Sequence, residues 1–344
     1  VPKRKLELLP LEKEVRLGHA VQLTPKFSTM TQRFPRPDTD RSQKSDYERS
    51  HSARLKSEDG QPVPDTTANT SKLRNLTGSF PHQGIMRIQY LPDGDFLVTA
   101  LRVQFGPNTR AHLEMWVLRK DLSRGLEPLG ETVFEGIAVS RKRNLIAWTT
   151  IEPALQNKES WQLAFVRPTK RYVAEIAYAG GVPRLVNKSE IMATLPSECR
   201  FIEPQDFRAN DSELVYSCLG MGPGGAIQIS VMANKLGGDR NLTYYRKPGE
   251  YDEVEGIAPS GDWAAVECGK QDKPGLPELD LCRLELREEG KLSVLVRGRS
   301  PGSTSDISNP VVSPDGKWLV FQRSDSASSD IGEGYGIYRL PLDN

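Results

Sequence analysis

Few side chains in this sequence are suited to proton transfer near neutral pH. The chain has four histidines, and His82 stands directly before an apolar segment with the pattern of a strand. Imidazole is the natural base at this pH. Tyr335 offers a second proton-transfer group, and the guanidinium of Arg323 can bind a carboxylate and stabilise charge that develops beside it. We predict His82, Tyr335 and Arg323 as catalytic, although a single histidine is more often structural.

A second group of polar residues recurs at one place in a repeated pattern, just before the first of two apolar segments. We predict that these residues bind substrate: Gln83, Glu135, Gln205, Glu253, Glu255 and Asn309. Arg102 and Arg110 lie where a second segment leads to a third, and we add them to the set. Carboxylates, amides and guanidinium groups pair well with the hydroxyls of a sugar. The alternative is that these residues line the water-filled mouth of a channel and bind no ligand.

The elements that must position these residues are short strand pairs. Each pair consists of an apolar strand, a tight polar turn and a second apolar strand: MRIQYLPDGDFLVTA at 86–100, EGIAVSRKRNLIAWTT at 135–150, PQDFRANDSELVYSC at 204–218, EGIAPSGDWAAVEC at 255–268 and NPVVSPDGKWLVFQ at 309–322. In LPDG and SPDG, proline presets one corner, aspartate bonds its own backbone and glycine takes positive φ. Alternation with period two predicts strands and excludes helices. A third strand is expected after each pair, for example SWQLAFVRP at 160–168.

These repeats predict an all-β chain, with residues 1–344 forming a single β-propeller of six or seven four-stranded blades. Because the last repeat lacks a fourth strand, we expect an N-terminal strand from LELLPL or EVRL to close the ring. Residues 32–74 are polar and almost free of large apolar side chains, which predicts a solvated insertion or a mobile segment. A poorly patterned blade is the alternative for that segment.

Charge and motifs exclude several classes of function. The net charge of +1 argues against a nucleic-acid binder, and no apolar run is long enough to span a membrane. No zinc, EF-hand, phosphate-loop or G-x-S-x-G pattern occurs, so no metal site is predicted and the cofactor stays unknown. Two carboxylates such as Glu135 and Glu255 would suit glycoside hydrolysis at the right separation.

The cysteines and the glycosylation signals indicate a secreted glycoprotein. We predict the disulfides Cys199–Cys218 and Cys268–Cys282, with four buried thiols as the alternative. N-x-S/T sequons occur at Asn69, Asn75, Asn187, Asn210 and Asn241, more than chance predicts in a chain with few asparagines. An extracellular location follows from both signals.

The units SPDGKWLVF and LPDGDFLVT resemble the TolB-like propeller repeat. The runs YDEVEGIAPSGDWAAVEC and GYGIYRLPL are also similar to secreted propeller lyases that act on oligogalacturonate or rhamnosyl-glucuronate chains. This resemblance implies a secreted polysaccharide lyase, with an acidic carbohydrate as its partner. A non-catalytic propeller that binds a glycan or a protein is the alternative function.

Overall fold

The computed structural model describes residues 21–22, 84–104, 110–121, 124–151, 169–191, 194–208, 210–222, 225–271, 279–298, 305–325 and 334–342. Within these ranges all regular elements are β-strands and no α-helix occurs. The prediction of an all-β chain is therefore confirmed for this part of the protein. No helix in these ranges is long and apolar enough to cross a membrane.

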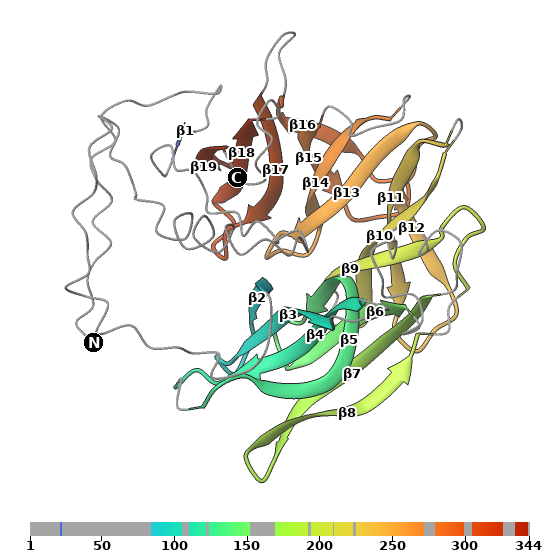
Figure 1. The fold of residues 1–344 in the computed structure, drawn as a ribbon. Coiled ribbons are helices and arrows are strands. Elements are labelled where there is room, and N and C mark those ends of the chain that lie inside the picture. The colour runs from blue at the N-terminus through green and yellow to red at the C-terminus, as the bar shows by residue number, and fades with distance from the viewer. Residues whose placement is uncertain are drawn as a thin grey trace, which may run out of the picture.

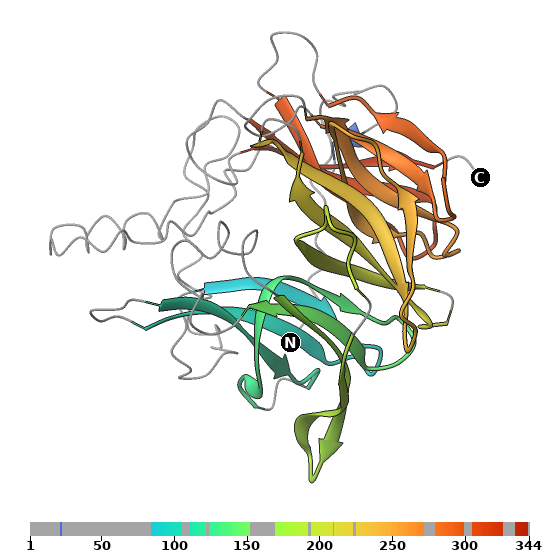
Figure 2. The same ribbon diagram turned by 90° about the vertical axis from the view of Figure 1, so that its right-hand side faces the viewer.

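The strands group into four-stranded antiparallel units, which we call blades, and a blade is named by its strands. The strands in chain order are β1 (Val21–Gln22), β2 (Gly84–Tyr90), β3 (Phe96–Gln104), β4 (Arg110–Leu118), β5 (Glu127–Val139), β6 (Leu145–Ile151), β7 (Thr169–Ala179), β8 (Val182–Glu190), β9 (Phe201–Arg208), β10 (Glu213–Met221), β11 (Ile227–Lys235), β12 (Asn241–Tyr245), β13 (Glu250–Ile257), β14 (Trp263–Lys270), β15 (Asp280–Glu285), β16 (Leu292–Val296), β17 (Ser305–Val312), β18 (Trp318–Asp325) and β19 (Gly334–Pro341). Successive blades follow one another along an arc, as in a β-propeller (Figures 1 and 2).

The pairing assigns every described strand to a blade. The blades are β2–β5, β5–β8, β9–β12, β13–β16 and the set of β17, β18, β19 and β1. The long strand β5 is both the last strand of one blade and the first strand of the next. The described residues thus hold five blades and no closed sheet, so the predicted six or seven blades and the closed ring stay predictions.

An N-terminal strand completes the last described blade. Val21 pairs with Arg339 and Gln22 with Tyr338, which places β1 outside β19 as a fourth strand. This strand lies a few residues beyond the two runs that the sequence suggested. The segment 32–74 and the expected strand at 160–168 lie outside the described residues. In the blade β5–β8 the third strand is β7, whose residues 169–175 pair with the whole of β6.

The turns have the expected chemistry. Gly94 and Gly316, the glycines of the two PDG turns, adopt positive φ of 93° and 73°. The carboxylate of Asp93 accepts a hydrogen bond from the main-chain N–H of Asp95 at 3.0 Å. The equivalent bond of Asp315 goes to the N–H of Lys317 at 3.1 Å. Each turn is thus closed by its own aspartate, as the sequence predicts.

Apolar clusters between the blades form the core. Between the first two described blades, the fully buried residues include Leu97, Met115, Ile137, Ile146 and Trp148. The disulfides Cys199–Cys218 and Cys268–Cys282 are present as predicted, with Cα–Cα distances of 5.4 and 6.1 Å. The second joins β14 to β15 within one blade.

Candidate functional site

The first strand of every described blade carries a β-bulge at a corresponding place. The pairing register shifts at Met86 in β2, at Glu135 and Gly136 in β5, at Gln205 in β9, at Glu255 in β13 and at Asn309 and Pro310 in β17. A bulge re-aims side chains and is frequent next to functional sites. Four of the residues predicted to bind substrate therefore lie at bulges inside the first strands, and not before the strands as the sequence suggested.

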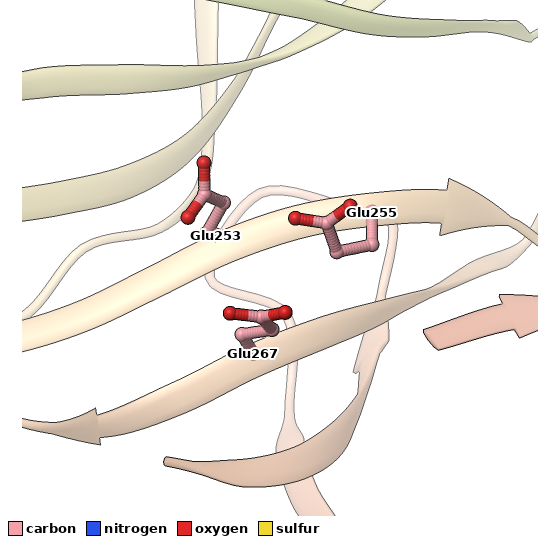
Figure 3. Close-up of side chains that lie close together, drawn as sticks. All are labelled: Glu253, Glu255 and Glu267. Atoms are coloured by element: carbon pink, nitrogen blue, oxygen red, sulfur yellow. The ribbon is translucent and has the colours of Figure 1, made fainter. Parts of the chain in front are cut away.

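Carboxyl groups from neighbouring blades gather beside these bulges. The side chains of Glu253 and Glu255 on β13 and of Glu267 on β14 lie close together (Figure 3). Each has a carboxylate oxygen within 4.8 Å of the others. Glu203 on β9 joins them from the preceding blade, because its side chain hydrogen-bonds to Glu253. We call Glu203, Glu253, Glu255 and Glu267 the carboxyl cluster.

Glu203 holds its proton near neutral pH. Burial, together with the charge and the hydrogen bond of Glu253, raises the pKa of its carboxyl group to about 8. The guanidinium of Arg87 lies 3.8 Å from Glu203 Oε1 and acts in the opposite direction, as does the hydrogen bond from Gln205. Since the bond to Glu253 favours the neutral form of Glu203, protonated Glu203 is the donor and Glu253 the acceptor.

Glu255 is also protonated more readily than usual. Burial raises its pKa well above the ordinary value, and the negative charges of Glu267, Glu253 and Glu203 act in the same direction. On the same strand, the hydroxyl of Tyr251 donates a hydrogen bond to Glu253. The cluster thus combines groups that retain protons with groups that accept hydrogen bonds, which is the arrangement of an acid–base site.

Glu267 also links two blades. Its Oε1 accepts a hydrogen bond of 2.6 Å from the main-chain N–H of Asn309 on β17. The hydroxyl of Thr149 makes a corresponding link to the carbonyl of Ile202, and the hydroxyl of Ser217 accepts from the N–H of Val254. Buried side chains on second strands therefore tie three of the described blades to the blade that follows, and one oxygen of Glu267 serves this purpose.

Asp252 lies between Tyr251 and Glu253 and is fully buried. In the part of the chain that the structure describes, neither carboxylate oxygen has a hydrogen-bond partner. Burial raises the pKa of this carboxyl group to about 8, helped by the charge of Glu250 and opposed by Lys247. Its neighbour across the sheet is Cys268 of the second disulfide.

The oxygens of Glu253, Glu255 and Glu267 are close enough together for one divalent cation to contact all three. A cation needs deprotonated carboxylates, so it would compete with the proton of Glu255. No spacing in the sequence indicated such a group, because its members meet only through strand pairing.

Five other predicted residues lie on strands that carry no member of the carboxyl cluster. Arg323 lies on β18, with its guanidinium carbon 5.9 Å from the ring centre of Tyr338. Arg102, Arg110 and Tyr335 lie on the strands β3, β4 and β19, and Glu135 lies on β5. His82 and Gln83 lie outside the described residues. The roles of all these residues stay predictions.

The predicted set does not contain three members of the site, Glu203, Glu267 and Arg87. Glu267 interrupts the apolar strand WAAVEC, and Arg87 interrupts the strand MRIQY. A charged residue inside an apolar strand segment was the signal that could have identified both. Burying such a group is costly unless it has partners or changes its protonation, which makes it a functional candidate.

No protein-family profile matches the sequence, and no curated protein matches it. Among solved structures, it is similar to a putative TolB from Agrobacterium tumefaciens, with a TM-score of 0.43 and 13% identity over 77% of this chain and 92% of that one. A puromycin-hydrolyzing peptidase of Mycobacterium tuberculosis has a TM-score of 0.45 and 14% identity, over 76% of this chain and 37% of its own. The Niastella koreensis GH74 enzyme has a TM-score of 0.45 and 10% identity, over the same shares. The chain spans little more than a third of these last two proteins.

Proposed function

We propose that the protein is a secreted lyase that cleaves a uronate-containing polysaccharide or oligosaccharide by β-elimination at the carboxyl cluster. The observation that supports this most is the hydrogen-bonded pair of Glu203 and Glu253, which shares a proton near neutral pH. β-Elimination needs a group that gives a proton and a group that takes one, and unequal proton affinity in one site supplies both.

The proposed step follows from these roles. The carboxylate of Glu253 removes the proton α to the uronate carboxylate, and the C–H electron pair forms the new C=C bond. The bond from the neighbouring ring carbon to the glycosidic oxygen breaks, and Glu203 protonates that oxygen. Arg87, 3.8 Å from Glu203, binds the uronate carboxylate and stabilises the charge that develops on it. Water then returns the protons to their starting positions.

The protonation of the cluster also makes an anionic substrate acceptable. Four ionised carboxylates would repel a uronate. The raised pKa values of Glu203 and Glu255 remove part of this charge at neutral pH, and Arg87 offsets more. The glutamates that remain ionised can accept hydrogen bonds from sugar hydroxyls.

A second candidate function is binding of a glycan or a protein without cleavage. The link from Glu267 to Asn309 favours it, because it gives part of the cluster a structural role. Polar groups in such a site would bind hydroxyls without any reaction.

One experiment separates these functions. The protein is incubated with a panel of acidic polysaccharides, and both ultraviolet absorbance and new reducing ends are recorded. β-Elimination produces an unsaturated uronate, which absorbs, together with reducing ends. Hydrolysis produces reducing ends alone, and binding produces neither. Assays with chelator and with added Mg²⁺, Ca²⁺ or Mn²⁺ test for a cation. Dependence on a cation would indicate that Glu253, Glu255 and Glu267 bind a metal ion.

A further inference from the structure

Gly136 and Glu203 are in close contact across two blades. Gly136 is buried at the bulge of β5, and Glu203 lies on β9, the first strand of the next blade. A Cβ atom on residue 136 would lie 2.7 Å from Glu203 Oε1 and 2.8 Å from its Cγ. It would also lie 2.9 Å from the main-chain oxygen of Pro204. Only a residue without a side chain leaves this space.

The backbone at Gly136 does not itself require glycine. Its φ is not among the positive values in the part of the chain that the structure describes. Glycine is therefore needed at this position because it has no side chain to fill the space, and not because of its conformational freedom. Because the Glu203 carboxyl fills that space, its distance from water and its direction toward Glu253 both depend on residue 136.

We propose that Gly136 is a positioning residue, which leaves the niche that holds the Glu203 carboxyl group against the main chain of β5 and directs it at Glu253. The proposal rests on the proposed function in one respect, that Glu203 is the proton donor. The position of the Glu203 carboxyl group relative to Gly136 and Glu253 can be tested without any substrate.

The chain contains a matched control. Gly256 follows Glu255 as Gly136 follows Glu135, and it lies at the corresponding bulge of β13. A Cβ atom on Gly256 would meet nothing closer than the oxygen of Pro310 at 3.8 Å. This is ordinary van der Waals contact, so Gly256→Ala adds the same methyl group beside a glutamate without a conflict.

The test compares Gly136→Ala and Gly256→Ala in the full chain. Crystal structures give the position of the Glu203 carboxyl. Carbon-13 NMR of labelled glutamate carboxyls follows its titration, assigned by the signal that Glu203→Gln removes. In Gly136→Ala we expect the carboxyl to leave β5 and to titrate at lower pH. In Gly256→Ala we expect neither change. A Glu203 carboxyl that keeps its position and titration in Gly136→Ala overturns the proposal.

If Gly136→Ala does not fold, the double variant Gly136→Ala with Glu203→Ala decides. Restored folding shows that the conflict is with the Glu203 side chain and supports the proposal. A double variant that stays unfolded assigns the conflict to the carbonyl of Pro204, and the proposal fails. A shift in titration without any cleavage of the polysaccharides would leave Gly136 as a positioning residue and remove the proposed lyase function alone.

Discussion

The carboxyl group of Glu203 on β9 donates a hydrogen bond to Glu253 on β13, so that two successive blades share one proton. The blades are joined at their first strands by this bond between side chains. In a propeller, first strands come close together although their residues are far apart in the sequence. A proton-sharing pair at this place therefore depends on how the blades stack, and proton donor and acceptor come from different repeats.

Replacing Glu203 with glutamine tests its role as the proton donor. The amide still donates a hydrogen bond to Glu253, so the fold and substrate binding should remain. It cannot release a proton, and we expect kcat to fall by about 10²-fold or more, as for loss of a general acid. The measurement is the initial rate of unsaturated uronate formation. The exposed residue Glu289 supplies the control Glu289→Gln, which should leave the rate unchanged. Full activity of Glu203→Gln would contradict the assignment.

The rate should decline as the pH rises through about 8. Above this value Glu203 loses the proton that the leaving oxygen needs, and the cluster gains a negative charge that repels a uronate. Replacing Arg87 with glutamine removes the positive charge that lowers the pKa of Glu203. The alkaline limb of kcat/KM should then move to higher pH. An unchanged limb would show that another group limits the rate.

The buried carboxyl group of Asp252 should make the protein less stable at high pH. Its pKa is raised in the folded state to about 8. The stabilisation is therefore complete below the unfolded value of about 4 and is lost as the pH rises through about 8. In Asp252→Asn this loss disappears, and we expect a gain on the order of 2–4 kcal/mol near pH 9 with little change near pH 4. Urea unfolding at both pH values measures it. A variant less stable than the parent at pH 9 would contradict this, because it would show that another group stabilises the ionised carboxylate of Asp252.

The hydrogen bond from the main chain of Asn309 to Glu267 should contribute to the packing of two blades. Glu267→Gln keeps an oxygen acceptor, so we expect a small loss of stability. Glu267→Ala leaves the N–H without this acceptor, at a cost of about 1–3 kcal/mol. Ser217→Ala, which removes a corresponding link, is the comparison. Equal stabilities of the glutamine and alanine variants, measured by urea unfolding, would exclude this role.

Counting free thiols before and after reduction tests both disulfides. Labelling of the denatured, unreduced protein is expected to find no free cysteine, and reduction should expose four. Removal of one bridge from a secreted domain typically costs about 2–5 kcal/mol. Cys268→Ser with Cys282→Ser should therefore lower the melting temperature. Detection of free thiols before reduction would argue against both bridges and weaken the argument for secretion.

The repeat, the turns and the disulfides could be predicted because they depend on local patterns. The corresponding places of Glu255 and Asn309 could be predicted for the same reason, since both lie at the first-strand bulge of their repeat. Their role in binding a substrate stays a prediction. The bulges themselves were not predicted, because a bulge is a mismatch between two strands and neither strand shows it alone. Glu267 and Arg87 were missed because their contacts depend on strand register and blade stacking. The burial of Asp252 has the same origin.

The pairing of β1 with β19 has a consequence for how the protein folds. It joins Val21 to Arg339, residues near opposite ends of the sequence, and makes the longest-range contact among the described strands. Contacts of high sequence separation form late, because the entropy of closing a long loop must be overcome before they contribute. The other blades are built from strands close in sequence and can assemble first. Until β1 docks, β19 has an unpaired edge open to another molecule, so the slow step in folding is also the one most exposed to aggregation.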